Sequence, residues 1–437
     1  MRVCVIGTGH VGLVTCSSLA AVGHEVVGVD SDSSKIERLK SGDCPFFEPG
    51  LPELVDEGVR SGRLRFSTEI SEGAPGAEIV FICVGTPPRE TGEANLAAVE
   101  NATRQVIQHL TRAAVIVEKS TVPAGTSDRI RRTLERERPD LAAQIEVVSN
   151  PEFLREGKAV EDAMNPDRLL IGGDGEAAFG PMRELYKPWI DRGVQVFETN
   201  IATAELAKHA CNAFLSTKIS FVNALARLCE RAGADVVAVA DVMGADARIG
   251  RPFLNAGLGY GGYCFPKDLL AFERLASRLG YEFGLLREVA AINDDAVRAT
   301  VEKVKDALWN MEDKRIAIFG LAFKPDTDDV RLSPALALAR QLLDEGAQVV
   351  GYDPEAGAGA KSEVPDLEVV STMWEAAEGA HCVVIATDWQ EFKEMDLERL
   401  KSVMAYPVVV DGRNIFEPAA MAQHGFTYYP TGRPAIS

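Results

Sequence analysis

The chain has 437 residues, of which 46% are hydrophobic and 25% charged, and it carries a formal net charge of −19. This length exceeds one typical hydrophobic core, so we expect two or three domains. The negative charge argues against a protein that binds nucleic acid or anionic membrane surfaces, because both need an excess of Lys and Arg.

Eight cysteines are spread along the chain without any pair at CxxC spacing, and several lie in apolar, strand-like runs. This pattern favours reduced thiols over a disulfide framework or a zinc site, so we expect a cytoplasmic protein without a bound metal. The first residues already read as a strand, and no apolar run approaches the length of a membrane span. We therefore expect neither a signal peptide nor a transmembrane helix.

Short β-branched runs alternate with helical stretches over residues 1–199. This alternation predicts a parallel sheet covered by helices. The expected strands are Val3–Ile6, Glu25–Val29, Ile79–Val84, Ala114–Glu118, Ile145–Ser149, Leu169–Ile171 and Val194–Phe197.

The first strand leads into a GxGxxG motif formed by Gly7, Gly9 and Gly12, with a helical stretch behind it. The first glycine permits a tight turn, the second lets a pyrophosphate approach the backbone, and the third lets helix and strand pack closely. Asp30 follows the second strand, where a carboxylate accepts ribose hydroxyls and repels a 2′-phosphate. We predict an NAD site; the alternative is an ordinary strand–turn–helix connection.

Other strand ends should line the same crevice, because ligands gather at the carboxyl ends of parallel strands. Thr86 and Thr121 follow two of these strands, although each is equally suited to a turn or cap. Glu152 and Glu156 follow a third strand, and their spacing would place both on one face of a helix. The alternative for the two glutamates is solvated surface charge.

The sequence pattern changes near residue 200, from alternating strands and helices to a long helical stretch. Residues 201–231 contain neither Pro nor Gly, which predicts one long helix that Gly233 ends. Lys208 and Asn212 lie one turn apart on it, and Lys208 is either a partly buried functional lysine or a surface lysine that reaches solvent. Helical texture resumes from Lys267 to about Met311.

A second α/β unit begins at Arg315. Its expected strands are Arg315–Phe319, Gln348–Tyr352, Cys382–Ala386 and Val408–Asp411, and the residues after about 416 give little signal.

The glycine-rich segment 257–268 ends in a cysteine, a proline, a lysine and an aspartate. Pro266 suits the first turn of a helix, so Cys264 would lie just before a helix N-terminus, where the macrodipole favours a thiolate. A nucleophilic thiol would then lie close to the carboxylate of Asp268. The alternative is a glycine-rich turn with a buried, inert cysteine.

Taken together, the motifs resemble the UDP-glucose/GDP-mannose dehydrogenase family over nearly the whole chain. In order they are GTGHVG, Asp30, VGTP, KSTVPAGT, NPEFLREG, AKHACNAF, ARIGRPFLNAG, GYGGYCFPKD and GLAFKPDTDDVR. The resemblance implies an α/β fold with two Rossmann-like, doubly wound parallel-sheet domains joined by a long central helix and helical region. The implied domains are an NAD-binding domain at 1–199, a helical dimerisation domain at 200–311 and a UDP-sugar-binding domain at 312–437.

The resemblance also implies NAD-dependent, four-electron oxidation of UDP-glucose at C6 to UDP-glucuronate. Cys264 would carry a thiohemiacetal and then a thioester, and Asp268 would act as general acid or base. Lys208 and Asn212 would stabilise oxyanions, Glu152 would assist thioester hydrolysis, and Thr121 would position water. A homodimer or higher homo-oligomer is expected.

The implied contacts form two groups. The NAD contacts are Gly7, Gly9, Val11, Gly12, Asp30, Lys35, Thr86, Thr121, Glu156, Lys267 and Arg331. The substrate contacts are Glu152, Phe153, Leu154, Lys208, Asn212, Arg248, Phe253, Leu254, Asn255, Ala256, Gly257, Gly261, Lys324 and Arg413, with Arg248 reaching the substrate of a neighbouring subunit.

Three alternative functions stay open. The same chemistry could act on UDP-N-acetylmannosamine or GDP-mannose. A two-electron dehydrogenase of the β-hydroxyacid type would need no thiol nucleophile. A non-catalytic NAD sensor would bind the dinucleotide without turnover.

Overall fold

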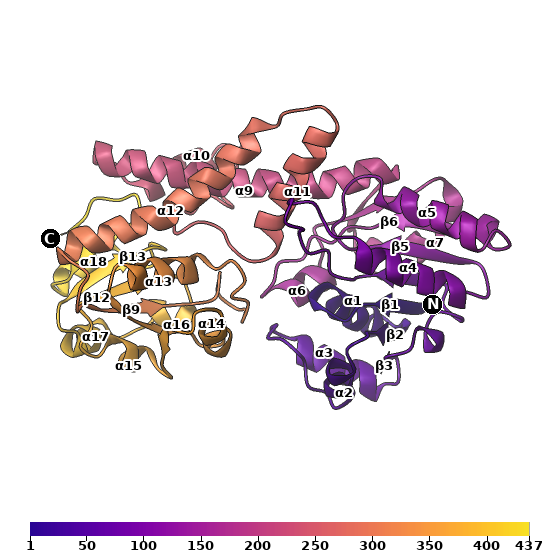
Figure 1. Cartoon of the computed structure of the whole chain (residues 1–437), viewed down its shortest axis with the longest axis horizontal. Helices are drawn as coiled ribbons and strands as arrows, with labels where there is room; N and C mark the ends of the chain where they lie inside the picture. The colour runs from indigo at the N-terminus through magenta and orange to yellow at the C-terminus, as the bar shows by residue number, and fades with distance from the viewer. Residues whose placement is uncertain (437) are drawn as a thin grey trace. The chain divides into compact units, whose positions relative to one another are not determined.

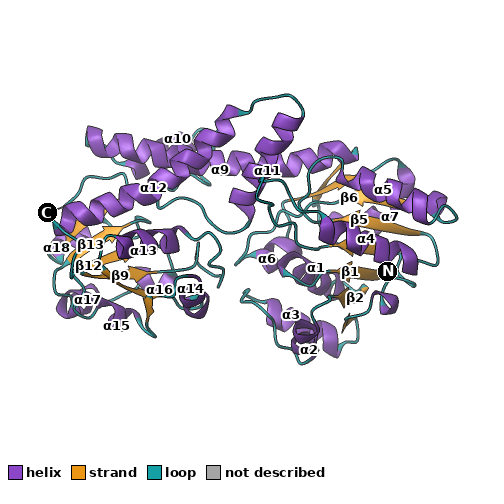
Figure 2. Cartoon of the chain, in the orientation of Figure 1, coloured by secondary structure: helices purple, strands orange, loops and turns teal. Residues whose placement is uncertain are grey.

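A computed structural model describes residues 1–436. The chain forms two compact units, the first made of Met1–Cys211 and Leu270–Leu279, the second of Asn212–Leu269 and the residues from Gly280 onward. Each unit contains one sheet with helices on both faces (Figures 1 and 2). The fold is α/β, with two doubly wound, Rossmann-like sheets and a long helix between them in the chain.

The first unit holds an eight-stranded sheet with the order β3-β2-β1-β4-β5-β6-β7-β8. Its strands are β1 (Arg2–Ile6), β2 (Glu25–Val29), β3 (Leu64–Ser67), β4 (Ile79–Ile82), β5 (Ala114–Glu118), β6 (Ile145–Ser149), β7 (Arg168–Gly172) and β8 (Gln195–Thr199).

Two features of this sheet correct the sequence-based expectation. The sequence analysis missed β3, a four-residue edge strand whose exposed Arg65 interrupts the apolar run. The expected all-parallel pairing is wrong at one place, because β7 runs antiparallel to β6, with Ser149 opposite Gly172. Strand direction depends on the path of the connecting segment, which hydrophobic periodicity does not encode.

Alternate residues of the central strands pack into different clusters. Ile79 and Phe81 of β4 lie in one apolar cluster, while Val80 and Ile82 lie in another. Both faces of the sheet are therefore buried, which explains the continuous apolar runs in its sequence. The helices of this unit are α1 (His10–Ala21), α2 (Ser33–Lys40), α3 (Leu51–Arg60), α4 (Ala97–His109), α5 (Thr126–Glu137), α6 (Ala159–Met164), α7 (Glu176–Leu185) and α8 (Lys187–Ile190).

The second unit holds a six-stranded, entirely parallel sheet with the order β11-β10-β9-β12-β13-β14. Its strands are β9 (Arg315–Phe319), β10 (Gln348–Tyr352), β11 (Glu368–Val369), β12 (Cys382–Ile385), β13 (Val408–Asp411) and β14 (Thr427–Pro430). The sequence analysis missed the edge strands β11 and β14, which are too short and mixed in character to show a strand period. The helices packed on this sheet are α13 (Pro334–Asp344), α14 (Gly357–Glu363), α15 (Met373–Ala377), α16 (Gln390–Lys393), α17 (Leu397–Val403) and α18 (Pro418–Gln423).

The helical region between the sheets contains α9 (Ile201–Ala232), α10 (Val236–Gly244), α11 (Cys264–Arg278) and α12 (Gly284–Leu308). Gly233, at φ +69°, follows α9 as expected for a C-terminal glycine. The expected helical stretch from 267 to 311 is two helices, which are separated around Gly280 at φ +80°. Among the described residues, no helix is long and apolar enough to cross a membrane.

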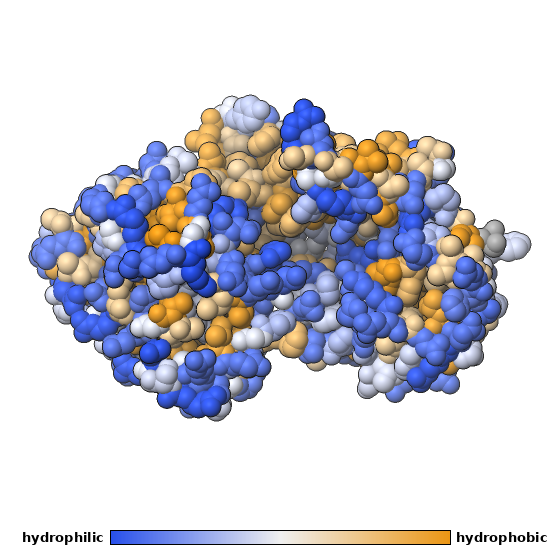
Figure 3. Space-filling model, turned by 180° about the vertical axis from the view of Figure 1, so that it is seen from behind, coloured by the Kyte–Doolittle hydropathy of each residue, from blue (hydrophilic) through white to orange (hydrophobic). Residues whose placement is uncertain are grey.

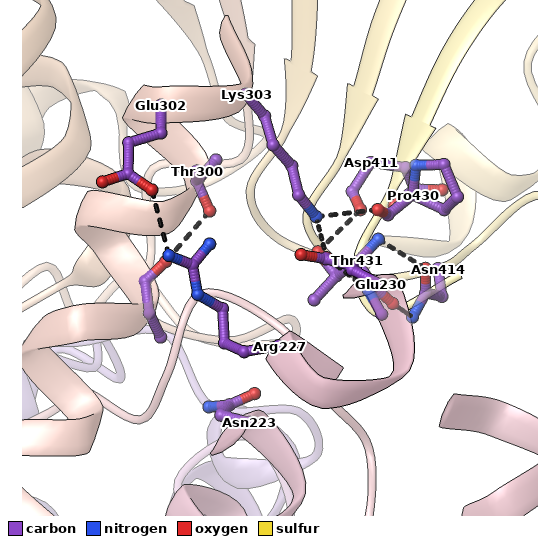
Figure 4. Close-up of polar contacts among 12 residues, drawn as sticks. Asn223, Arg227, Glu230, Thr300, Glu302, Lys303, Asp411, Asn414, Pro430 and Thr431 are labelled. Carbon is purple, nitrogen blue, oxygen red and sulfur yellow. Dashed lines mark hydrogen bonds and ion pairs between the residues drawn. The ribbon is translucent and has the colours of Figure 1, made fainter. Parts of the chain in front are cut away.

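Polar contacts tie α9 and α12 to the second sheet (Figure 4). Lys303 of α12 lies 2.5 Å from the Glu230 carboxylate of α9 and donates to the Pro430 carbonyl of β14 at 2.8 Å. Burial lowers the pKa of Lys303, and the carboxylate opposes this shift. Arg227, one turn before Glu230 on α9, donates at 3.0 Å to Glu302, the residue before Lys303 on α12. These contacts fix the C-terminal half of α9 within the second unit.

Candidate active site

The glycines of the GxGxxG motif differ in the space around them. Gly7 has φ +93°, and a Cβ there would lie 2.7 Å from the Cys83 carbonyl oxygen. A Cβ on Gly12 would lie 1.8 Å from the Gly7 oxygen, so α1 packs directly on the loop. A Cβ on Gly9 would meet nothing within 4 Å. The loop therefore presents open backbone at Gly9, where a pyrophosphate would approach the helix N-terminus.

Asp30 lies at the end of β2, beside this loop. Its Oδ2 atom accepts hydrogen bonds from the Thr8 amide at 2.8 Å, the Thr8 hydroxyl at 3.0 Å and Lys35 Nζ at 2.8 Å. Burial opposes ionisation of Asp30, but the hydrogen bonds from Lys35 and from the Asp32 and Thr8 amides outweigh it and lower the pKa. An ionised carboxylate at this position fits the ribose hydroxyls of NAD.

A buried ion pair joins the segment after β6 to α9. Glu152 Oε1 lies 2.9 Å from Lys208 Nζ of α9, and both side chains are almost fully buried. Lys208 also lies over the Phe153 ring, 5.3 Å from its centroid. The alternative interpretation of Lys208 as a surface lysine is therefore wrong. Thr121 is half-buried, and its carbonyl accepts a hydrogen bond from the Thr86 hydroxyl at 3.0 Å.

Glu152 and Glu156 do not share a helical face, contrary to our expectation. Residues 151–157 form a loop, and α6 begins only at Ala159. The Glu152 carboxylate turns back to accept from the Leu154 amide at 2.6 Å. Gly157 at φ +77° ends the loop in a conformation that α-helices exclude. Leu154 and Glu156 are both half-buried in this loop.

A polar cluster behind these strand ends escaped the sequence analysis. Lys119 Nζ donates to Asn150 Oδ1 at 3.1 Å, and the Tyr186 hydroxyl donates to the same atom at 2.6 Å. Glu118, the residue before Lys119, is also buried, and burial raises its pKa to about 8. A Lys and a Glu at the end of a strand are usually solvent-exposed charges. The available signal was that Lys119 opens the KSTVPAGT motif and that Glu118 directly precedes it.

In the second unit, Cys264 is the first residue of α11. We expected Cys264 just before the N-terminus of a helix. The structure differs by one residue, because the helix starts at the cysteine itself. All eight cysteines fall within the described residues, and Cys264 is the one that is exposed. By contrast, burial raises the pKa of the Cys4 and Cys83 thiols to about 12. The interpretation of Cys264 as a buried thiol is wrong.

One turn further along α11, two buried donors hold the carboxylate of Asp268. Lys267 Nζ donates to Oδ1 at 2.6 Å, and the Asn212 amide of α9 donates to Oδ2 at 2.6 Å. The aspartate is therefore fixed in orientation close to the first turn of α11, which carries the thiol.

The segment 253–257 approaches the second sheet closely. Asn223 Oδ1 accepts from the Gly257 amide at 2.8 Å, and a Cβ on Gly257 would lie 2.7 Å from the Gly412 oxygen. Leu254 and Ala256 are buried, Asn255 Oδ1 accepts from Arg251, and Phe253 has φ +65°. Asn223 escaped the sequence analysis, because one amide on a long helix carries no distinctive pattern.

Basic side chains surround this segment within the second unit. Arg413 donates from Nε to the Ala386 carbonyl at 2.7 Å, and burial lowers its pKa. Arg331 stacks over the Tyr263 ring at 4.7 Å, and Lys324 over Phe323 at 5.4 Å. A Cβ on Gly261 would lie 2.5 Å from the Leu332 oxygen, so only glycine fits there. Arg248 is largely exposed and pairs with Asp246 at 2.6 Å.

The candidate residues divide between the units. Thr121, Glu152 and Lys208 belong to the first, whereas Asn212, Cys264 and Asp268 belong to the second. The fold and these sites define a class: an NAD-dependent oxidoreductase that combines a dinucleotide-binding Rossmann domain with a second Rossmann-like domain and an exposed thiol.

Family models place the chain more specifically. Residues 1–190, 202–295 and 317–418 match the NAD binding, central and UDP binding domains of the UDP-glucose/GDP-mannose dehydrogenase family. The chain belongs to this family.

Curated relatives and solved structures agree with the assignment. A UDP-glucose 6-dehydrogenase from Rhizobium meliloti (strain 1021) is 46% identical, covering 99% of this chain and 100% of the relative. The UDP-glucose 6-dehydrogenase YwqF from Bacillus subtilis (strain 168) is 42% identical, and the match covers 100% of this chain and 98% of the relative. The structure of a UDP-glucose dehydrogenase from the archaeon Pyrobaculum islandicum superposes with a TM-score of 0.91 at 37% identity, covering 99% and 98%. A UDP-D-ManNAc dehydrogenase structure from Pyrococcus horikoshii gives 0.86 at 30% identity, covering 100% of both chains.

Proposed function

We propose that this chain oxidises UDP-glucose at C6 to UDP-glucuronate in an NAD-dependent, four-electron reaction. The observation that carries the proposal is the exposed thiol of Cys264 at the start of α11, one turn from the buried Asp268 carboxylate. The names of the full-length relatives supply the substrate.

The covalent chemistry belongs to Cys264. Bound NAD supplies the acceptor for each of two successive hydrides, one per NAD molecule. After the first oxidation, the Cys264 thiolate adds to the C6 aldehyde and forms a thiohemiacetal. Loss of the second hydride and of the hydroxyl proton converts this adduct into a thioester, and water then releases the carboxylate and regenerates the thiol. The thiol thus retains a reactive aldehyde and prepares it for the second oxidation.

Neighbouring side chains assist the reaction of Cys264 with the sugar. Asp268 moves the proton of the C6 hydroxyl, and hydrogen bonds from Lys267 and Asn212 hold its carboxylate in one orientation for this step. Lys208 and Asn212 stabilise the oxyanions through a positive charge and an amide donor. Glu152, paired with Lys208 at 2.9 Å, assists the hydrolytic water, which Thr121 positions.

Two separate sets of residues bind NAD and the sugar nucleotide. The GxGxxG loop with Val11, and Asp30 with Lys35, hold the adenosine side of NAD, and Thr86, Glu156, Lys267 and Arg331 complete its contacts. The sugar nucleotide lies on segment 253–257, Gly261, Lys324 and Arg413, where tight backbone contacts and half-buried cations favour an anionic diphosphate.

We propose three functional parts, 1–199, 200–311 and 312–437, with the central part forming a homodimer. Phe214, Phe221 and Leu228 recur every seven residues along α9 and are 66%, 54% and 61% exposed. Such a stripe on a long helix favours burial against a second copy. Apolar patches also interrupt the mainly hydrophilic face in Figure 3. Within the described residues, none of the eight cysteines forms a disulfide, which favours a cytoplasmic location.

The decisive experiment measures NADH formed per nucleotide sugar consumed, across UDP-glucose, UDP-N-acetylmannosamine and GDP-mannose. Two NADH per UDP-glucose are expected, and one would favour a two-electron dehydrogenase. Cys264→Ser should stop complete oxidation because an oxygen ester is a poorer intermediate than a thioester, whereas Cys44→Ser serves as the matched control. Normal uronate production by Cys264→Ser would exclude the covalent route, and a clear preference for another sugar would overturn the substrate.

A further inference from the structure

A polar pocket of about 210 Å³ lies in the first unit and contains none of the site residues described above. Its walls come from the loop between β4 and α4, from the segment that enters α5, and from the face of α11 at residues 271–278. All of these segments belong to the same compact unit. The pocket therefore stands apart from the dinucleotide loop within one well-defined body.

Four arginines line this pocket. They are Arg89, Arg129, Arg274 and Arg278, against a single acidic side chain, Glu93. Over the described residues 1–436, none of the four guanidinium groups forms an ion pair or a side-chain hydrogen bond. Elsewhere on the first unit, Arg104 and Arg131 pair with carboxylates. The concentration of unpaired cations stands out in a chain with a net charge of −19.

Like charges gathered around one pocket repel each other, so a bound anion would relieve this repulsion. Guanidinium groups match phosphate oxygens in a forked, two-bond geometry and are the preferred phosphate ligands at such sites. The volume of about 210 Å³ lies below the range of about 300–1,000 Å³ typical of drug-sized ligands. A compact, multiply charged phosphate fits these properties better than a nucleotide.

The N-terminus of α5 does not supply this anion site. The Gly125 and Ser127 amides already donate to the Glu205 carboxylate of α9, at 2.6 and 2.9 Å. The arginine side chains are therefore the groups left for recognition.

We propose that this arginine-lined pocket binds a compact, multiply charged phosphate compound of the size of inorganic pyrophosphate. Residues Pro123, Ala124 and Thr126 form one wall of this pocket. The site is separate from substrate turnover and is tested by binding alone.

The test is isothermal titration calorimetry of the full chain with pyrophosphate at constant ionic strength. Saturating NAD and UDP are present, so that the nucleotide sites are already filled. The Arg129→Ala/Arg274→Ala double variant should weaken binding by at least about tenfold, because charge-assisted hydrogen bonds are lost. Arg132→Ala, an exposed arginine on α5 outside the pocket, is the matched control and should bind as the unmodified chain does.

Two further measurements keep the proposal falsifiable. Circular dichroism checks that the variants fold, and the charge-reversal variant Arg278→Glu should weaken binding in the same direction. Hydrogen exchange should show protection by pyrophosphate at residues 87–96, 121–129 and 271–278. Absence of binding, equal weakening by Arg132→Ala, or protection confined to the GxGxxG loop would each overturn the proposal.

Discussion

The side-chain amide of Asn212 donates to Asp268 Oδ2 at 2.6 Å, joining the long helix α9 to the first turns of α11. The second oxygen of the carboxylate accepts from Lys267 at 2.6 Å, and all three side chains are buried. A carboxylate held from both sides has little freedom to rotate, which suits a group that must meet a proton in one geometry.

Asp268→Asn should therefore reduce both turnover and stability. Removing the charge leaves the buried Lys267 unpaired, which costs about 3–5 kcal/mol in comparable buried pairs. We expect kcat to fall by at least about 100-fold, within the range for loss of a general acid or base. Steady-state NADH formation and thermal unfolding measure the two effects. Glu273→Gln, one turn further along α11, is the control, and equal losses in that variant would argue against a specific role for Asp268.

Substitutions at two glycines of the GxGxxG loop should affect NAD binding and stability separately. Gly9→Ala should leave the melting temperature unchanged, because a Cβ there meets no atom within 4 Å. It should nevertheless weaken NAD binding, since the methyl group occupies the approach of the pyrophosphate. Gly12→Ala should destabilise the unit, because its Cβ would lie 1.8 Å from the Gly7 oxygen. Differential scanning fluorimetry and NAD titration compare the variants; a destabilised Gly9→Ala protein would contradict this division.

Glu118 makes stability depend on pH. Burial raises its pKa from 4.5 to about 8, so between these values the folded state holds a proton that the unfolded state has lost. Stability then falls as pH rises through this window, by at most about 1.4 kcal/mol per pH unit. Glu118→Gln keeps the acceptor for the Ser120 amide and should remove this dependence. Urea unfolding from pH 5 to 8 provides the measurement.

The matched variant is Glu57→Gln, an exposed glutamate on α3. Its unfolding free energy should follow that of the unmodified chain at every pH. If Glu118→Gln also follows the unmodified chain, the carboxyl group does not titrate in this window.

The apolar stripe on α9 predicts an oligomer that a single charge within the stripe would disrupt. Phe221→Asp places a charge in the middle of the stripe, where burial against a second copy would desolvate it. We expect the protein to shift from dimer to monomer in light scattering coupled to size exclusion. Leu279→Asp changes an exposed leucine outside α9 and should leave the mass unchanged. A monomeric unmodified protein, or a dimer in Phe221→Asp, would contradict the proposed interface.

Some features were predictable because they depend only on residues close together in the sequence. The glycines of the nucleotide loop, the acid after β2 and the thiol at the start of α11 each depend on a turn, a strand end or a helix terminus. The edge strands β3, β11 and β14 were missed, because short pieces with mixed character obtain their stability from the neighbouring strand.

The sequence by itself determined the two doubly wound sheets, the long helix and the family, since apolar periodicity and contiguous motifs can be read directly along the chain. Only the tertiary structure decided that Lys208 pairs with Glu152, that Asn212 holds Asp268, that β7 reverses direction and that four arginines share one pocket. These features join residues far apart in sequence, and packing rather than any local preference brings them together.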